Sequence, residues 1–262
     1  MIELKLAGRT IKTERKAFVM GILNATPDSF YEDSRGGIER AVKMIEDGAD
    51  IIDVGAESTR PGSSYIDAEE EMKRLIPVIK EIRKISDIPV SVDTRKKIVM
   101  ERAFDSGADI LNDISALEDD SEMVNFASQK KIPVILMHRN AICKRPFEEV
   151  NEYLLKRASF AEKNGISSEK IIVDPGIGFN KNLEDNVDLI KNCGKLADGK
   201  YKILMALSRK RCMGEITGRS VEERLPATLA ANLISVIKGV SLVRVHDVKE
   251  TIDTLEILRY TY

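Results

Sequence analysis

The sequence has little of what marks several common classes of protein. Its three cysteines (Cys143, Cys193 and Cys212) form no Cys-x-x-Cys pair, so we expect free thiols in a reducing compartment. The net charge of −2 gives no indication of a nucleic-acid-binding surface. No apolar run reaches the roughly 18 residues of a membrane-spanning helix, and the charged stretch 1–16 has no apolar signal core. These absences favour a cytoplasmic protein that binds neither membranes nor nucleic acid.

The chain also lacks a linker or low-complexity stretch, so we expect a single domain over residues 1–262. Three similar segments recur, at residues 47–55, 106–114 and 238–246. In each one a glycine (Gly48, Gly107 or Gly239) is expected to end a helix in the left-handed conformation, and an apolar strand follows. This recurrence indicates helix–strand units throughout the chain.

Short, continuous apolar runs are typical of strands that are buried on both faces. Eight such runs end near Leu23, Val54, Val92, Leu111, Met137, Val173, Leu207 and Val245. Amphipathic segments that predict helices span residues 38–47, 68–85, 96–106, 122–131, 150–164, 183–192, 225–238 and 248–260. Eight βα units in about 250 residues predict an α/β fold of the (β/α)8 TIM-barrel type.

Residues 2–6 and 10–13 flank Ala7-Gly8-Arg9 and predict a short β-hairpin. We expect residues 1–15 to form a lid over the amino-terminal end of the barrel. A doubly wound open sheet is the alternative fold, but no Gly-x-Gly-x-x-Gly motif follows any of the predicted strands.

Polar residues follow the predicted strands, and in a barrel the carboxyl ends of the strands carry the site. One group offers fixed hydrogen-bond acceptors (Asp93, Asn112 and Asp174), which suit a flat heterocycle rich in N–H donors. A second group is cationic (Arg60, Lys210, Arg244 and His246) and suits phosphate oxygens. The two groups together predict a substrate with a donor-rich ring at one end and a phosphate at the other.

Some of these residues have other interpretations. Asp53 could contact a ligand or anchor a neighbouring loop, and His246 could be structural. Arg60 could pair with Glu57. We expect His138 to be structural and Asp247 to cap the helix that begins at Val248.

Specific motifs in this order resemble the dihydropteroate synthase family over nearly the whole chain. They are GILNATPDSF (21–30), DVGAESTRPG (53–62), SVDTRK (91–96), NDIS (112–115), LMH (136–138), DPGIGF (174–179), SRK (208–210) and VRVHDV (243–248). The resemblance implies a TIM-barrel transferase of folate biosynthesis that is the target of sulfonamides. It implies condensation of 6-hydroxymethyl-7,8-dihydropterin pyrophosphate with p-aminobenzoate, with release of pyrophosphate and a requirement for Mg²⁺. A homodimer formed through the later helices is also implied.

The resemblance also assigns roles to positions of this chain. Those implied for the pterin are Asp93, Asn112, Met137, Asp174, Phe179 and Lys210. Those implied for pyrophosphate are Asn24, Arg60, Arg244 and His246, with Asn24 also reaching Mg²⁺. Thr59, Ser208 and Lys210 would meet p-aminobenzoate, and Phe30 and Pro61 would cover it. The catalytic set implied is Asp93, Asp174, Lys210, Arg244 and His246.

Two alternatives within this resemblance remain: the pterin-binding barrel of methyltransferases, and a pterin-binding paralogue without catalysis. The cations Arg60, Lys210, Arg244 and His246 argue against a methyltransferase, which has no need to hold pyrophosphate. The chain departs from the family pattern at Asn180, where a glycine is usual, and in residues 139–142 after the fifth strand.

Overall fold

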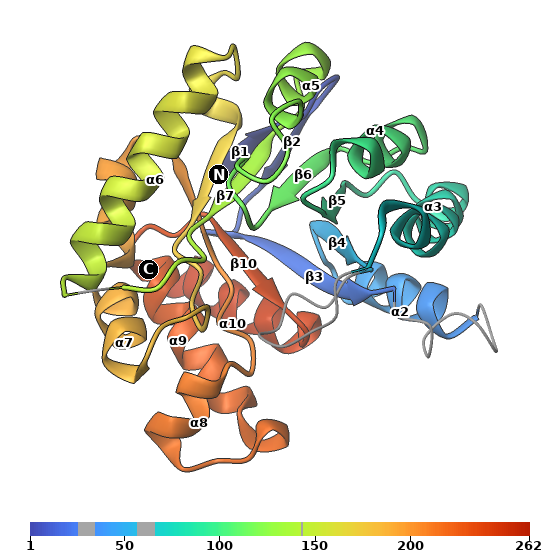
Figure 1. Ribbon diagram of the computed structural model, residues 1–262. Helices are drawn as coiled ribbons and strands as arrows, with labels where there is room; N and C mark the ends of the chain where they lie inside the picture. The colour runs from blue at the N-terminus through green and yellow to red at the C-terminus, as the bar shows by residue number, and fades with distance from the viewer. Residues whose placement is uncertain (26–34, 57–65, 143) are drawn as a thin grey trace.

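The computed structural model describes residues 1–25, 35–56, 66–142 and 144–262, and within them eight parallel strands form a closed barrel (Figure 1). In order around the barrel the strands are β10 (Leu242–Val245), β3 (Phe18–Asn24), β4 (Ile51–Gly55), β5 (Val90–Asp93), β6 (Ile110–Asp113), β7 (Val134–Met137), β8 (Ile171–Asp174) and β9 (Lys202–Met205). The TIM-barrel prediction is confirmed, and the open sheet was the wrong alternative because β10 pairs with β3 and closes the ring.

Helices follow the strands and surround the barrel (Figure 1). They are α2 (Arg35–Glu46), α3 (Ala68–Ile85), α4 (Lys97–Asp105), α5 (Met123–Lys130), α6 (Pro146–Lys163), α7 (Leu183–Asn192), α8 (Arg211–Thr217), α9 (Leu225–Ile237) and α10 (Val248–Thr261). Short 3-10 helices lie at η1 (Ser168–Lys170), η2 (Cys193–Gly199) and η3 (Val221–Glu223). None of the helices in the described part of the chain has the length and apolarity that crossing a membrane requires.

The predicted amino-terminal hairpin is present and packs against the beginnings of the barrel strands. Strand β1 (Ile2–Lys5) pairs with β2 (Thr10–Thr13) in antiparallel register. Leu4 and Leu6 are buried in one cluster with apolar residues from the beginnings of the barrel strands, among them Phe18 and Met20. Burial of these side chains stabilises the hairpin against the amino-terminal end of the barrel. The opposite end, where the strands finish, is the open face.

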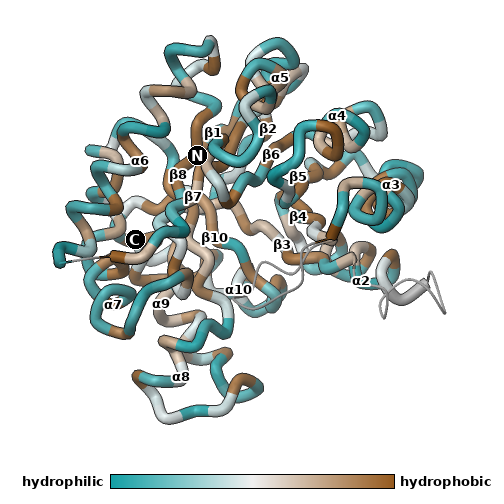
Figure 2. Tube along the Cα trace, viewed as in Figure 1, coloured by the Kyte–Doolittle hydropathy of each residue, from teal (hydrophilic) through white to brown (hydrophobic). Residues whose placement is uncertain are grey.

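Alternation along the strands explains why polar side chains lie inside the barrel. Side chains of a strand point alternately to its two faces. Ile51, Ile110, Ile172 and Leu242 pack together in the barrel interior, whereas their neighbours in sequence pack outward against the helices. The residue two positions further along each of these strands is Asp53, Asn112, Asp174 or Arg244. These four side chains therefore point inward, next to the apolar layer formed by Ile51, Ile110, Ile172 and Leu242. Figure 2 shows the contrast between the apolar strands and the polar outer faces of the helices.

The predicted helix boundaries are close to those observed, and the differences have local causes. Helix α6 begins at Pro146, four residues before the predicted start, because proline is well tolerated in the first turn. Helix α8 was missed because its seven residues are too few for a periodic pattern. Gly48, Gly107 and Gly239 have positive φ angles, as predicted.

The prediction that Asp247 caps α10 was wrong. The Asp247 side chain makes no capping hydrogen bond. Its two carboxylate oxygens instead accept hydrogen bonds from Nε and Nη2 of Arg209, at 2.9 and 2.8 Å. A bidentate charged pair is stronger than a neutral cap, and it ties the loop after β9 to the end of β10.

Candidate functional site

Arg244 lies at the centre of the polar layer inside the barrel. Its Nε donates to Oδ2 of Asp53 at 2.7 Å, and its Nη2 lies 3.6 Å from Oδ2 of Asp93. Asn112 Nδ2 lies 3.3 and 3.2 Å from the two carboxylate oxygens of Asp53. Asp53 is 0% exposed and contacts Arg244 on β10 and Asn112 on β6, so its partners in the structure are two other strand residues of the site and not a neighbouring loop.

Two carboxylates of this layer have raised pKa values. Burial, with the negative charge of Asp53 adding to it and the guanidinium of Arg244 opposing it, raises the pKa of Asp93 to about 7. Burial also raises the pKa of Asp174, against the stabilising N–H of Gly176 and the positive charge of Lys210. Buried groups of this kind are typical of functional sites, because their charge responds to what binds beside them.

Lys210 and Phe179 meet on the β8–β9 side of the barrel. The Lys210 Nζ lies 4.8 Å from the centre of the Phe179 ring, within the range of a cation–π contact. Asp174, at the end of β8, accepts a hydrogen bond from the backbone N–H of Gly176 at 2.7 Å. Met137 ends β7 and is buried. These residues are brought together as the sequence predicted.

Ser208 and His246 form a pair on adjacent strand ends. The Ser208 Oγ lies 2.9 Å from Nδ1 of His246, and the backbone N–H of His246 donates to the same oxygen at 3.1 Å. Ser208 is buried and His246 is exposed, so the histidine presents its outer edge to solvent at the open face.

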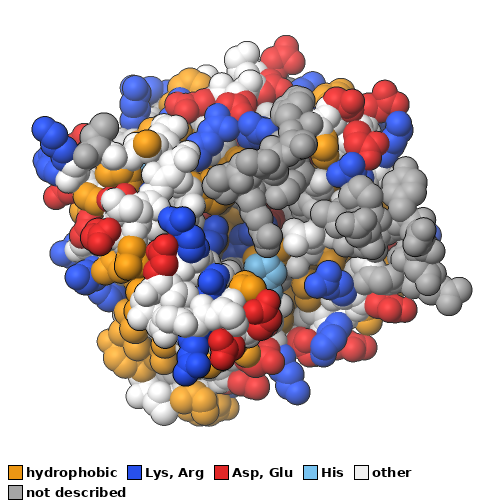
Figure 3. All heavy atoms as spheres, turned by 60° about the horizontal axis from the view of Figure 1, so that its bottom comes forward, with side chains coloured by type: hydrophobic (Ala, Val, Ile, Leu, Met, Phe, Trp, Pro, Cys, Tyr) orange, Lys and Arg blue, Asp and Glu red, His pale blue; other side chains and the backbone are white. Residues whose placement is uncertain are grey.

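Asn24 ends β3 with an exposed side chain. It lies in register with Gly55, which pairs in turn with Asp93, and Asp93 pairs with Asn112. The four predicted residues Phe30, Thr59, Arg60 and Pro61 lie outside the described residues. Figure 3 shows Lys and Arg side chains bordering a hollow in the face of the molecule that it presents.

His138 is structural, as predicted. It is buried, and its ring packs edge-on against Tyr153 with 4.9 Å between the ring centres. Burial and the positive charge of Lys181 lower the pKa of His138 to about 4, so the ring is neutral at physiological pH.

Sequence reasoning missed Lys181, a buried lysine whose ammonium touches the loop after β8. It follows the end of β8 by seven residues and belongs to neither polar group defined above. Its burial depends on the path of the loop, so no local pattern could have found it.

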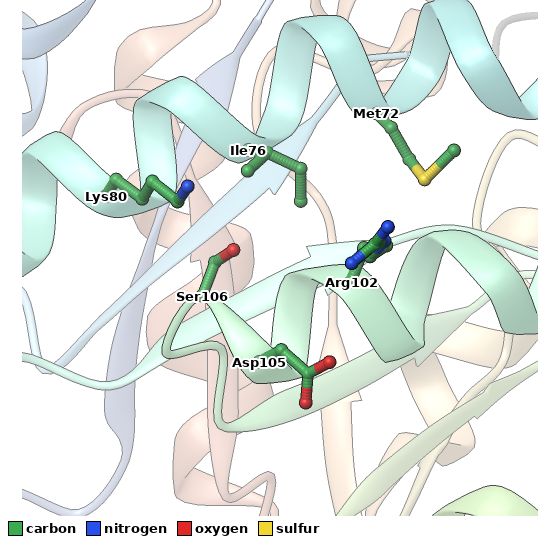
Figure 4. Close-up of a pocket in the computed structure, with 6 residues that line it drawn as sticks. All are labelled: Met72, Ile76, Lys80, Arg102, Asp105 and Ser106. Atoms are coloured by element: carbon green, nitrogen blue, oxygen red, sulfur yellow. The ribbon is translucent and has the colours of Figure 1, made fainter.

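A surface groove between α3 and α4 lies away from these residues. Met72, Ile76, Lys80, Arg102, Asp105 and Ser106 line it (Figure 4). All six come from α3, from α4 or from the residue after α4, and none is a strand-end residue. The groove is therefore separate from the site inside the barrel.

The arrangement has a clear chemical capacity. Asp93, Asn112 and Asp174 present acceptors at the bottom of an open cup. Arg244, Lys210 and His246 add positive charge or hydrogen-bond donors around it. Such a cup can bind a planar donor-rich ring and stabilise positive charge on that ring while it holds an anion nearby.

Comparison with known proteins agrees with this geometry. A family model described as "Pterin binding enzyme" matches residues 20–246. The dihydropteroate synthase of Clostridium beijerinckii is 40% identical over 255 residues, which cover 94% of this chain and 95% of that protein. The structure of Xanthomonas albilineans dihydropteroate synthase with 4-aminobenzoic acid is similar, with a TM-score of 0.93 and 37% identity over 98% of this chain and 97% of that one. Yersinia pestis dihydropteroate synthase in a sulfonamide drug complex has a TM-score of 0.92 and 31% identity, over 99% of both chains.

Proposed function

The chain belongs to the dihydropteroate synthase family of pterin-binding enzymes, and on that premise we propose which of its residues carry out the reaction. The activity is a transfer that condenses 6-hydroxymethyl-7,8-dihydropterin pyrophosphate with p-aminobenzoate, giving 7,8-dihydropteroate and pyrophosphate. The assignment of residues rests on one connected group inside the barrel, in which Asp53 and Asp93 contact Arg244 and Asn112 donates to Asp53.

The pterin lies in the cup with its N–H edge toward the acceptors. Asn112 on β6 and Asp174 on β8 offer buried oxygens from two strand ends that β7 separates, and Asp93 on β5 lies 3.6 Å from the Arg244 guanidinium. Met137 and Phe179 supply apolar contact for the ring faces, and Lys210 reaches across Phe179 to the ring. A planar ligand gains affinity here because the acceptors are held in place before it arrives.

The reaction begins with cleavage of the bond between the pterin methylene carbon and the pyrophosphate oxygen. The electron pair leaves with pyrophosphate, and the positive charge spreads over the pterin. The carboxylates of Asp93 and Asp174 stabilise this cation, whereas Arg244 and His246 stabilise the departing anion. Fixed charges of this kind commonly supply the largest part of catalysis, with one donor worth about 3–4 kcal/mol. The amine nitrogen of p-aminobenzoate, beside Ser208, then forms the new C–N bond and loses a proton to solvent.

Asn24 is the residue we assign to Mg²⁺. Its exposed side chain supplies one oxygen ligand at the open face, and no cluster of three His, Cys, Asp or Glu side chains suited to a metal exists among the described residues. This donor set fits Mg²⁺, which usually keeps several waters and shares substrate phosphates with one or two protein ligands. When bound, the ion would neutralise charge on the leaving pyrophosphate.

A homodimer through α9 is our proposal for the assembly. Ala230, Ile234 and Ile237 lie on one exposed face of this helix, at spacings of four and three residues. Ile216 and Val221 add further exposed apolar surface nearby in the chain. Figure 3, in which the α8 end of Figure 1 comes forward, shows apolar side chains gathered toward one edge. We place the enzyme in the cytoplasm, where the buried free thiols of Cys193 and Cys212 would stay reduced.

The test is release of pyrophosphate from purified protein given pterin pyrophosphate and p-aminobenzoate, with and without Mg²⁺. Release that requires both substrates is expected. Pterin binding without release would instead favour the methyltransferase-like or non-catalytic alternative.

Variants then test the assignment of residues. Lys210→Ala is expected to weaken binding of the pterin, and Arg244→Ala to weaken binding that depends on the pyrophosphate. Calorimetry with pterin pyrophosphate measures both, with the exposed Lys195→Ala as the matched control. Unchanged affinity in both site variants would contradict the assignment.

A further inference from the structure

The loop between β8 and α7 folds around a buried ammonium group. Lys181 is 5% exposed, and its Nζ donates to three backbone carbonyl oxygens: those of His138 at 3.0 Å, Gly176 at 3.0 Å and Phe179 at 3.1 Å. One of these carbonyls belongs to the end of β7 and two belong to the loop itself. The three donors of a lysine are thus all used, and the ammonium joins two neighbouring strand ends.

The backbone conformation of this loop depends on that arrangement. Gly176 has a φ of +67°, and a Cβ at this position would lie 1.9 Å from the carbonyl oxygen of His138. Asn180 has a φ of 46°, which asparagine tolerates better than most residues, so it can replace the glycine that the family usually has. The loop is therefore pressed closely against the end of β7. Three carbonyl oxygens directed at one point repel one another unless a cation lies between them.

The same loop carries two residues of the pterin site. Asp174 begins it and accepts from the N–H of Gly176 at 2.7 Å. The N–H of Phe179 donates to the carbonyl of Gly176 at 3.1 Å, which closes a turn, and the Phe179 ring lies beneath the Lys210 ammonium. Any shift of Gly176 therefore moves the Asp174 carboxylate and the Phe179 ring together.

We propose that Lys181 is a positioning residue for the pterin site, whose ammonium holds the loop so that Asp174 and Phe179 keep the geometry that pterin requires. It acts through these residues and touches no substrate itself. The inference rests on the proposed function, because it takes pterin to be the ligand of Asp174.

The charge of Lys181 distinguishes a positioning role from a purely structural one, because only a positioning role makes pterin affinity depend on the protonation of the amine. Burial lowers the pKa of Lys181 to about 8, Asp174 and Asp185 oppose this shift, and Lys210 adds to it. His138 also packs near it and stays neutral over this range. Above pH 8 the amine has only two N–H groups for three carbonyls, so one carbonyl loses its partner. Pterin affinity is therefore expected to weaken as the pH rises through 8.

The experiment compares wild type with Lys181→Met, Lys181→Arg and the control Lys195→Met, which removes an exposed lysine. Calorimetry with pterin pyrophosphate at pH 7 is expected to give roughly 10- to 100-fold weaker binding for Lys181→Met, a loss of the size seen when a group that orients a metal ligand is removed. The apparent KM for the pterin should rise more than kcat falls. Lys181→Arg should restore part of the affinity and abolish the weakening above pH 8, because arginine stays protonated.

Two results would overturn the proposal. One is equal pterin affinity in wild type and in folded Lys181→Met. The other is an unchanged alkaline loss of affinity in Lys181→Arg, and this comparison decides the matter if Lys181→Met does not fold by circular dichroism. Failure of the proposed function is seen separately. Wild type that binds pterin but releases no pyrophosphate refutes the reaction and leaves the Lys181 comparison valid.

Discussion

Replacing Asp53 by asparagine removes the buried anion beneath Arg244 while it preserves the shape of the side chain. Asp53 is 0% exposed and accepts from Arg244 Nε at 2.7 Å. At an effective dielectric constant of about 20, two unit charges about 4 Å apart attract by about 4 kcal/mol. The net loss is smaller than this attraction for two reasons. The substitution also removes the repulsion between Asp53 and Asp93, and the partly exposed guanidinium of Arg244 is partly stabilised by water. We expect a net loss of about 3 kcal/mol in the free energy of unfolding, at the lower end for broken buried pairs.

The substitution also changes the site. Asp93 becomes the nearest anion to Arg244, so its pKa should fall below 7, and the guanidinium should turn toward it. We therefore expect Asp53→Asn to weaken binding of pterin pyrophosphate as well as to lower Tm by about 6–12 °C, from about 2–4 °C per kcal/mol for a chain of this size. Differential scanning fluorimetry and calorimetry measure the two effects.

Asp50→Asn is the matched control. Asp50 is a half-buried carboxylate that is also paired with an arginine, with Oδ1 2.5 Å from Nη2 of Arg15 and Oδ2 2.7 Å from the N–H of Val19. It lies just before β4, at the amino-terminal end of the barrel. Asp50→Asn should lower Tm and leave ligand affinity unchanged. If Asp53→Asn changes neither Tm nor affinity, the central role of this ion pair is refuted.

Three further predictions concern other parts of the scaffold. The pKa of Asp93 is raised from 3.8 to about 7, so the folded state binds a proton that the unfolded state lacks between these values. The stability of wild type relative to Asp93→Asn should therefore fall by up to about 4 kcal/mol as pH rises from 4 to 7 and stay level above, which urea unfolding across this range would measure. Glu71→Gln removes the fully buried partner of Lys96, whose Nζ lies 2.6 Å from Oε2, and should cost about 3 kcal/mol in chemical denaturation. A second substitution, Lys96→Gln, should recover part of that loss, and strict additivity would contradict the pairing. Gly176→Ala should destabilise the protein more than Gly199→Ala, because both glycines have a φ near +68° but only Gly176 would place a Cβ against a backbone oxygen. Equal losses of Tm in the two variants would argue against that steric contact.

The periodicity of apolar and polar residues along the sequence was sufficient to predict the order of strands and helices. The helix over residues 68–85 and the helix over 183–192 were predicted at their observed bounds, because a helical period and a clear start are properties of adjacent residues. Helix α8 and the Arg209–Asp247 pair were not predicted, since the helix is too short for a period and the pair joins residues 38 apart. The polar positions at the predicted strand ends led to Asp93, Asn112, Asp174, Lys210 and Arg244, and four of these five lie in strands, where alternation decides which way a side chain points.

The sequence by itself determined the strand and helix order, the inward direction of the polar strand ends and the chemical character of the site, because these depend on short-range periodicity and on motif identity. Only the tertiary structure decided which of these groups touch. Asp53 meets Arg244 across 191 positions of sequence because β10 closes the ring beside β3, and Lys181 meets His138 because the loop after β8 folds back on the end of β7. The order of strands and helices predicts a barrel, but it does not specify which side chains meet across the closed ring or how one loop folds back, because these contacts join residues far apart in the sequence.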